Sequence, residues 1–542
     1  MFDSQKPMLP NRFATNPEGG RAMVKKNNFL LSVSVLLGLA LSQVSAGVPA
    51  SVSLHNRLIQ VSLNGADGRI TVQDQRNHQQ WSQKVLTADN RLLSARAADS
   101  GANAIETSWL HVPSGLGYHV GLSIPAESPE VLIELAADAQ AEMPGNLTFP
   151  QPFVTERGSY LVIPMNEGIS YPVEDASIPT TALSAYSSFG ICMGFFGASD
   201  GQRGYMGILE TPNDARIRLE RLDGNLCVAP AWEPQKKHFG YDRKIRYVFF
   251  DQGGHVAICK RYRAYAQQRG LVKTLAEKRQ ENPNVDLLVG AVNVWARDSS
   301  AVSLVKEMQA LGIERILWSA GGQAETIRAL NEIPGVLTSR YDIYQDLMDP
   351  SLITNKLGGY RHGDWVQQAW PKDIVIGASG DWIKGWQVKG KDGTLYPCAV
   401  LCDAVAPPYA RQRILEDLKK RPFRCRFIDT TTASALRECY SSAHPQTRSE
   451  CRQHRMELLD VVSREMKQVT GCENGTEAAV PYLHYLEGMM SLSQYRIPDS
   501  GRNTARIVDE VPDRVAKFQV GHRYRLPLWE LVFHDCVVSQ WY

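Results

Sequence analysis

The sequence predicts a multidomain chain in which a β-sandwich precedes a (β/α)8 TIM-type barrel, an α/β and β architecture. Three observations support this prediction. The 542 residues exceed what one hydrophobic core normally holds, short alternating segments fill the first half, and strands alternate with helices in the second half. We divide the chain into a leader with a signal peptide (1–46), a sandwich (50–275) and a barrel (285–542).

The N-terminus has the pattern of an export signal. Lys25 and Lys26 precede the uncharged apolar run Phe29–Leu41, and small residues follow up to Ala46. The run has 13 residues, fewer than the roughly 20 that span a membrane, and an uncleaved anchor is the alternative. We expect cleavage near Ala46, a periplasmic or secreted protein without stable membrane insertion, and Met23 as the start of translation.

The sandwich region reads as short strands joined by turns. The stretch "RLIQVSLNGADGRITVQD" contains two strand-like runs joined across Asn64 to Gly68. Recurring Gly, Pro, Asn and Asp, with little helical periodicity, predict that residues 50–275 are nearly free of helix. The charged, Pro-bearing stretch "EKRQENPNVD" then predicts a linker.

The barrel region repeats a strand followed by a helix. "VDLLVGAVNVWA", "ERILWSAG" and "GVLTSRYDIY" are expected strands, and "AVSLVKEMQALGI" and "QAETIRALNEI" are expected helices. An inserted hairpin follows, with its turn near Lys391 to Gly393. The helix "YARQRILEDLKKR" leads into a strand ending at Asp429, the next helix leads into a strand ending at Glu473, and "LWELVFHDCVVSQWY" supplies a sixth strand.

Six strands of this spacing favour a barrel over a doubly wound sheet, because no glycine-rich phosphate loop follows the first strand. The chain stops after the sixth strand, so we expect a barrel truncated at the C-terminus, with an open sheet edge. A complete protein with another layout is the alternative.

Charge and cysteine content exclude several classes of function. The 59 Lys+Arg and 57 Asp+Glu leave a net charge of +2 without a basic block, which argues against a nucleic-acid partner. The ten cysteines form no CxxC pair and show no zinc-ligand spacing, while Cys439 and Cys451 flank a polar loop that a local disulfide would close. Four others are expected to be buried apolar side chains: Cys192, Cys425, Cys472 and Cys536.

Two acids end two consecutive barrel strands. Asp429 closes the strand in "FRCRFIDTTTA", and Glu473 closes the strand in "VTGCENG". Barrel enzymes carry their chemistry at the carboxyl ends of the strands, and two carboxylates there are what glycoside hydrolysis needs. The structural alternative is that Asp429 caps the Thr-rich turn after it and that Glu473 is a solvated loop acid.

Further candidates for substrate contact fall near predicted strand ends, where aromatic faces stack on sugars and acids hold hydroxyl groups. They are Trp295, Trp318, Tyr341, Asp342, His534 and Asp535. The pairs Tyr341–Asp342 and His534–Asp535 are favoured, because a polar pair that ends an apolar strand needs partners. For each residue alone, a core or surface position is the alternative.

The segments "RFIDTTTA", "GCENG", "SRYDIYQDLMDP" and "PLWELVFHDCVVSQWY" resemble the bacterial glycoside hydrolases of family 129, relatives of the family 101 endo-α-N-acetylgalactosaminidases. The resemblance covers roughly residues 50–542. It implies a sandwich before a (β/α)8 barrel and retaining hydrolysis of terminal α-linked N-acetylgalactosamine on mucin-type O-glycans. Asp429 would be the nucleophile and Glu473 the general acid/base. It also implies a bound metal, calcium, whose ligands no local loop identifies.

Three functions follow from these observations. The first is a retaining exo-α-glycosidase that acts on a glycan or glycoprotein. The second is an exported carbohydrate-binding relative with impaired catalysis, against which the intact Asp429 and Glu473 argue. The third is an α-glycosidase of another specificity, such as α-galactosidase. The sequence leaves open the sugar and its linkage, exo or endo action, and the oligomeric state.

Overall fold

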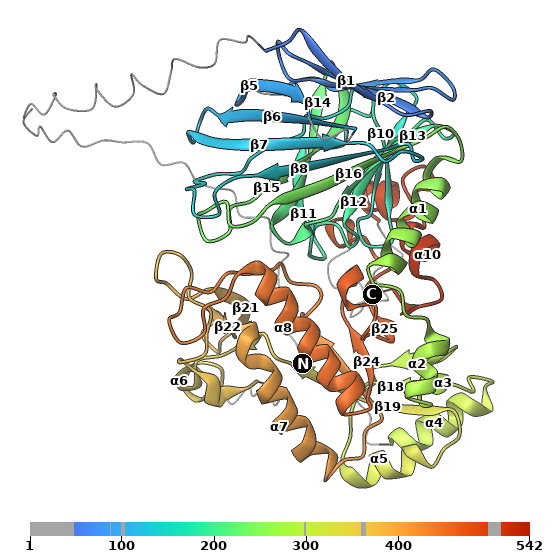
Figure 1. Ribbon diagram of the computed structural model, residues 1–542. Coiled ribbons are helices and arrows are strands. Elements are labelled where there is room, and N and C mark those ends of the chain that lie inside the picture. Colours follow the sequence, from blue (N-terminus) through green and yellow to red (C-terminus); the bar gives the residue numbers. More distant parts are fainter. Residues whose placement is uncertain are drawn as a thin grey trace, which may run out of the picture.

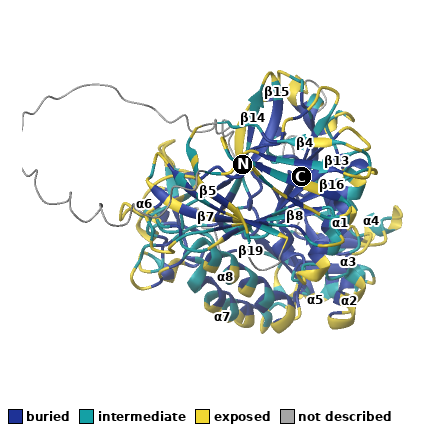
Figure 2. Cartoon of the chain, turned by 45° about the horizontal axis from the view of Figure 1, so that its top comes forward, coloured by how far each residue is buried: buried dark blue, intermediate teal, exposed yellow. Residues whose placement is uncertain are grey.

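The computed structural model describes residues 48–86, 88–98, 103–296, 300–358, 365–496 and 511–541. The expected leader and signal peptide lie outside the described residues. Figure 1 shows a β-rich half packed against an α/β half. Figure 2 shows buried residues along the strands and exposed residues on the loops and the outer faces of the helices.

The β-rich half consists of three antiparallel sheets around one hydrophobic core. A nine-stranded sheet has the order β10-β9-β12-β13-β16-β8-β7-β6-β5, and it shares its core with the sheets β1-β2-β3-β4 and β11-β14-β15. Buried and exposed residues alternate along strands such as β7, as expected for strands that cover a core on one face. The two runs expected around Asn64 to Gly68 are β2 and β3.

The strands of this half have the following bounds: β1 (Ser51–His55), β2 (Ile59–Asn64), β3 (Ile70–Asp74), β4 (Gln80–Ser82), β5 (Asn90–Ala97), β6 (Ala104–His111), β7 (Leu116–Ser123), β8 (Glu130–Ala136), β9 (Tyr160–Ile163), β10 (Ile169–Pro172), β11 (Thr181–Ser184), β12 (Phe195–Ser199), β13 (Gly204–Leu209), β14 (Ala215–Leu222), β15 (Asn225–Trp232) and β16 (Arg243–Phe250).

The expectation that residues 50–275 are nearly free of helix is wrong at α1 (Gly254–Gln268). Ile258, Tyr262 and Ala266 recur every four residues in "GHVAICKRYRAYAQQ", and this spacing gives the helix one buried face. The buried face packs against β12 and β13 and against α10 of the second half, beside which α1 lies in Figure 1. The helix thereby joins the two halves.

The α/β half is built on a curled parallel sheet with the order β17-β18-β19-β23-β24-β25-β26. The side-chain amide of Asn293 on β17 donates a hydrogen bond to Oε1 of Gln540, directly after β26, at 3.1 Å. The two outer strands of the sheet therefore come within side-chain reach of each other. Their bounds are β17 (Val292–Val294), β18 (Ile316–Trp318), β19 (Val336–Ile343), β23 (Cys425–Asp429), β24 (Val469–Cys472), β25 (Tyr485–Leu486) and β26 (Val538–Ser539).

This sheet differs from the sequence prediction in three places. It has seven strands and not six, because β25 has only two residues, too few to produce a recognisable pattern. The expected first strand contains the short helix α3 (Val285–Leu288), and only Val292–Val294 is extended. The expected last strand begins as helix α10 (Leu528–Phe533), since its apolar residues recur at helical spacing.

Helices cover the outer face of the curled sheet, and the predicted hairpin forms a small sheet of its own with the order β20-β22-β21. In Figure 1, α7 and α8 lie side by side on one flank, and α4 and α5 lie on another. These elements are α2 (Leu275–Glu281), α4 (Ala301–Ala310), α5 (Ala324–Asn331), α6 (Pro350–Asn355), α7 (Ala406–Leu418), α8 (Arg448–Asp460), α9 (Asp513–Val515), β20 (Asp346–Leu347), β21 (Lys384–Lys389) and β22 (Leu395–Val400). Within the described ranges, no helix is both long and apolar enough to cross a membrane.

All ten cysteines are buried free thiols, so the expected Cys439–Cys451 disulfide is absent. The Sγ atom of Cys451 lies 3.1 Å from a carboxylate oxygen of Asp403, and Cys439 lies beside His444. The two cysteines flank the same loop, but their side chains have different partners. The four cysteines predicted to be buried apolar side chains are confirmed as buried.

Candidate active site

Three acids occupy equivalent positions at the carboxyl ends of three adjacent strands. Asp429 is the last residue of β23, and the residue before it pairs with Cys472, which ends β24. Glu473 therefore lies next to Asp429. Cys472 in turn pairs with the last residue of β25, which places Glu487 next to Glu473. Since neighbouring parallel strands lie about 4.8 Å apart, the three carboxyl groups form a row across the sheet edge.

A layer of aromatic side chains lies directly beneath this row. Residues two positions earlier pair in the same way, Tyr341 with Phe427, Phe427 with Gly471, and Gly471 with Tyr485. The rings of Tyr341 and Phe427 stack with centroids 5.9 Å apart, and the ring of Tyr485 covers Gly471. Because side chains alternate between the two faces of a strand, the aromatic layer and the row of acids share the inner face of the sheet.

Two local features orient the carboxylate of Asp429. The hydroxyl of Tyr341 donates a hydrogen bond to its Oδ2 atom at 2.5 Å. The next residue, Thr430, has φ = 60°, in the left-handed region that a β-branched residue rarely adopts. Such strain persists only where the surrounding structure enforces it, and it is concentrated at functional sites.

Burial and the negative charge of Glu473 raise the pKa of Asp429 well above its ordinary value. The hydrogen bond from Tyr341 acts in the opposite direction, because it stabilises the ionised form. Two adjacent carboxyl groups do not both ionise readily, so the pair retains a proton to higher pH than an isolated acid.

Glu487 is a part of this row that the sequence analysis missed. Its carboxylate accepts a hydrogen bond from the side-chain amide of Asn293 at 2.7 Å and another from the side chain of Trp295. Burial is the main cause that raises the pKa of Glu487 to about 7. The available signal was an acid directly after the apolar segment "YLHYL", the same pattern that identified Asp429 and Glu473.

The structure brings Trp295 and Tyr341, both predicted from the sequence, to the row of acids. Trp295 is 44% exposed, and its ring meets those of Tyr341 and Phe427 edge to face. An exposed indole beside carboxylates is suited to stacking on a sugar. Trp318 is different, because it is buried among α4 and α5 and its indole N–H donates to the carbonyl oxygen of Gly321 at 2.8 Å.

Asp342 lies on the opposite face of β19 from Tyr341, because consecutive strand residues alternate in direction. It is fully buried, and its Oδ2 atom lies 2.6 Å from the guanidinium of Arg426. Arg426 also pairs with Asp417 of α7 at 2.6 Å. Asp342 is thus part of a buried ion network beneath α7 and is turned away from the acids.

His534 and Asp535 follow helix α10, so the prediction that they end a strand is wrong. The ring of His534 lies 2.8 Å from the carbonyl oxygen of Glu530, one helical turn earlier. Both carboxylate oxygens of Asp535 bind the guanidinium of Arg263 on α1, at 2.9 and 2.7 Å. The side chains of this pair thus contact α1 and α10, and the backbone carbonyl of Asp535 accepts from the N–H of Leu275, the first residue of α2.

One group of potential metal ligands in the structure does not suit calcium. Among the described residues, the group of three or more potential ligand side chains that lie close together is Cys402, Cys439 and His444. Calcium prefers six to eight oxygen ligands, whereas thiolates and imidazole suit softer cations.

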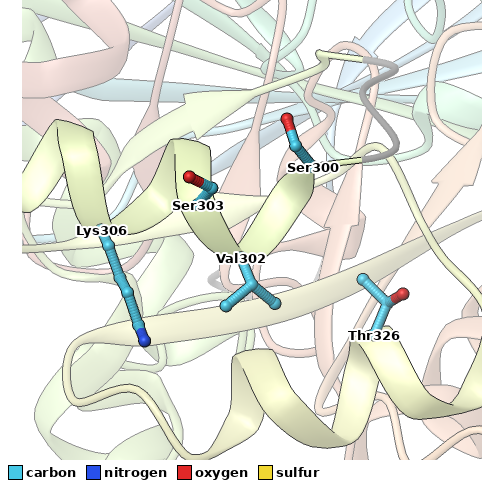
Figure 3. A pocket seen from close by; sticks show the side chains of 5 residues that line it. All are labelled: Ser300, Val302, Ser303, Lys306 and Thr326. Atoms are coloured by element: carbon cyan, nitrogen blue, oxygen red, sulfur yellow. The ribbon is translucent and has the colours of Figure 1, made fainter.

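A surface hollow between α4 and α5 is shown in Figure 3. The residues that line it are Ser300, Val302, Ser303, Lys306 and Thr326. Its lining includes one cation and no acid, so it lacks the pair of carboxylates that the strand ends provide.

Part of the chain matches a known protein family. Residues 307–504, which include Asp429 and Glu473, match the family described as "Glycosyl hydrolases related to GH101 family, GH129", and this confirms the resemblance expected from the sequence. No curated protein matches the chain.

Solved structures match over most of the chain. The ligand-free α-N-acetylgalactosaminidase NagBb from Bifidobacterium bifidum superposes with a TM-score of 0.70 at 20% identity, over 90% of this chain and 85% of that chain. Its GalNAc complex gives a TM-score of 0.71 and its quadruple mutant 0.72, each at 20% identity over 90% of this chain and 84% of the other. At this identity the matches show a shared fold.

Proposed function

Since residues 307–504 match glycoside hydrolase family 129, we propose that this protein is a retaining α-glycosidase that removes terminal α-linked N-acetylgalactosamine, or a related α-glycoside, from glycans. The observation that carries the proposal is the adjacency of Asp429 and Glu473 at the ends of paired strands. NagBb, which shares the fold, is described as an α-N-acetylgalactosaminidase, and this favours N-acetylgalactosamine as the sugar.

In the first step, a carboxylate oxygen of Asp429 attacks the anomeric carbon while Glu473 gives a proton to the departing glycosidic oxygen. The C–O bond to the leaving group breaks, and a β-linked glycosyl-enzyme forms. In the second step, Glu473 takes a proton from water, which attacks the same carbon and releases the α-anomer together with free Asp429. This mechanism requires the two carboxyl groups to lie about 5–5.5 Å apart.

The proposed mechanism needs one proton on the pair of acids. The pair holds one proton more readily than an isolated acid does, because the charge of Glu473 adds to the desolvation of Asp429. Tyr341 donates to Asp429, and this hydrogen bond opposes the raised pKa of Asp429 because it stabilises the ionised form. The mechanism needs the shared proton on Glu473, so that Asp429 can attack and Glu473 can protonate the leaving group.

Variants of the two acids, assayed with azide, distinguish the two roles. Asp429→Ala should lower turnover of every substrate by about 10^4-fold, and azide should then attack from the vacated face and yield the β-glycosyl azide. Glu473→Ala should spare substrates with good leaving groups in the first step, and azide should give the α-glycosyl azide. If Asp429→Ala gives the α-glycosyl azide and Glu473→Ala gives the β-glycosyl azide, then Glu473 is the nucleophile and Asp429 the general acid/base. Near wild-type activity of both variants would refute the assignment of these two acids.

The substrate class and stereochemistry have direct assays. A panel of aryl α-glycosides should be cleaved fastest when the sugar is N-acetylgalactosamine, and α-galactoside as the best substrate would select the alternative specificity. NMR of the reaction should show the α-anomer released first. Release of the β-anomer first would mean an inverting enzyme.

Export and calcium binding are separate proposals. N-terminal sequencing of the exported protein should begin at or near Gly47, and a mature protein that retains Lys25 would refute cleavage. Calcium, implied by the resemblance alone, should be lost on dialysis against a chelator with a change in melting temperature. Protein that holds no calcium before dialysis, or that loses calcium with no change in melting temperature, would refute it.

A further inference from the structure

We propose that Cys402, Cys439 and His444 bind a thiophilic divalent cation, Zn²⁺. The two sulfur atoms and a ring nitrogen all lie within 4.8 Å of one another, and all three residues are buried. They belong to different segments, since Cys402 follows β22 whereas Cys439 and His444 belong to the loop between β23 and α8. This separation along the chain explains why the sequence shows no zinc-ligand spacing.

The hydrogen bonding of His444 leaves one ring nitrogen for a metal. Its Nε2 atom lies 3.0 Å from the carbonyl oxygen of Lys372, and since a carbonyl can only accept, Nε2 carries the proton. The lone pair of Nδ1 then faces the Sγ atom of Cys439 at 3.4 Å. Metal-binding histidines usually have such a carbonyl or carboxylate partner on the second nitrogen, which fixes the ring.

The separations fit a tetrahedral zinc site. Zinc–sulfur bonds of about 2.3 Å and zinc–nitrogen bonds of about 2.0–2.1 Å put the sulfur and nitrogen donors about 3.5 Å apart. The observed 3.4 Å between Cys439 and His444 agrees with this value. An oxygen for the fourth position is nearby, because Oε1 of the buried Gln446 lies 3.8 Å from the Sγ atom of Cys402.

The surroundings supply the dry shell of a structural site. Val375 and Val400 pack with both cysteines, and Ile383 borders the same cluster. Binding Zn²⁺ would release a proton from each thiol and place the cation between two thiolates and a neutral imidazole. Neither sulfur is engaged in a disulfide.

A cation here would join the inserted hairpin to the loop that follows β23. Strand β22, which leads to Cys402, pairs with β20, and Asp346 of β20 adds to the charges that act on Asp429. Zinc would therefore hold the sheet β20-β22-β21 in place beside the row of acids. Its expected role is structural, because no carboxylate of the row is a ligand.

Metal analysis tests the proposal. The full-length protein, refolded with equimolar Zn²⁺ and freed of excess metal, should hold about one zinc per chain, and Cys402→Ser and His444→Ala should each hold less than about one tenth of that. Cys398→Ser is the matched control, because Cys398 is a buried thiol of β22 outside the group, and it should keep the zinc. X-ray absorption of the wild-type protein should show two sulfur neighbours at about 2.3 Å.

Three outcomes would overturn the proposal. The first is wild-type protein that holds no zinc after this treatment. The second is an equal zinc content in Cys402→Ser, His444→Ala and Cys398→Ser, or an X-ray absorption spectrum of the wild type that shows no sulfur neighbour of the zinc. The third is a peptide map under non-reducing conditions in which Cys402 and Cys439 are joined as a disulfide. The wild-type measurements decide the matter even if a variant fails to fold.

Discussion

At the scale of single residues, Glu487 makes stability depend on pH. The pKa of Glu487 is about 7 in the folded protein, whereas that of a glutamate in an unfolded chain is about 4.3. Between these values the folded state binds more protons than the unfolded state. The free energy of unfolding should therefore fall as pH rises from about 4 to about 7, by on the order of 3 kcal/mol from this group.

We therefore predict that the stability of Glu487→Gln, measured relative to the wild type, increases when the pH is raised from 5 to 8. The glutamine keeps an oxygen for the amide of Asn293 but carries no charge. Urea unfolding at the two pH values measures the effect, with the exposed Glu332→Gln as control. An equal stability difference at both pH values would contradict the raised pKa.

At the scale of single strands, Gly471 on β24 leaves room for the aromatic layer. A Cβ atom there would lie 2.0 Å from Cζ of Tyr485, so Gly471→Ala must push the ring away. We expect a loss of about 1–3 kcal/mol, with lower activity because the ring lies beneath the acids. Thermal unfolding measures the loss.

Gly117→Ala is the matched control, because Gly117 also lies within a strand, β7, and a Cβ atom there would meet nothing within 4 Å. It should change stability by less than about 0.5 kcal/mol. Shortening the ring by Tyr485→Leu in the Gly471→Ala background should recover part of the loss. Equal effects of the two alanine variants would refute the crowding.

Substitution of Asp342, in the ion network between β19, β23 and α7, distinguishes a structural role of this residue from a contact with substrate. If Asp342 holds Arg426 in the core, Asp342→Ala should cost about 3–5 kcal/mol, because it leaves a buried guanidinium short of a partner. The exposed pair Arg96–Glu106 gives the control, in which Glu106→Ala should cost less than about 0.5 kcal/mol. A raised KM with unchanged stability would instead support the substrate contact expected from the sequence.

At the scale of the whole molecule, one hydrophobic cluster spans the two halves. A hydrophobic cluster runs from Val162 and Ile258 in the first half to Ile428 and Trp529 in the second. The carboxylate of Glu477 accepts hydrogen bonds from the hydroxyl of Tyr262 and, at 3.1 Å, from the backbone N–H of Gly194. The loop that follows β24 and contains Glu473 and Glu477 is thus held by the β-rich half.

We predict that the chain unfolds in one cooperative transition and that Tyr262→Phe lowers its midpoint. Removing the hydroxyl takes a donor from a buried carboxylate, which costs about 1–3 kcal/mol. Calorimetry measures both the number of unfolding transitions and the midpoint of the variant. Two transitions, of which the variant shifts only one, would show that the halves unfold independently.

The sequence by itself determined the alternation of strands and helices from β18 to β24 and the two acids at the carboxyl ends of β23 and β24, because these depend on local patterns of apolar residues. It also determined the resemblance to family 129, whose family model matches residues 307–504. It did not reveal β25 or helix α1, since a two-residue strand has no period and the helix lay within a region rich in turns.

Only the tertiary structure decided which side chains meet. The register of three parallel strands placed Glu487 beside Glu473, and the alternation of faces turned Asp342 away from Tyr341. Folding also brought Cys402 to Cys439 and His444, and Tyr262 to Glu477. These contacts join residues far apart in the chain, and no local pattern records them, because strand pairing and packing of the whole core set their positions.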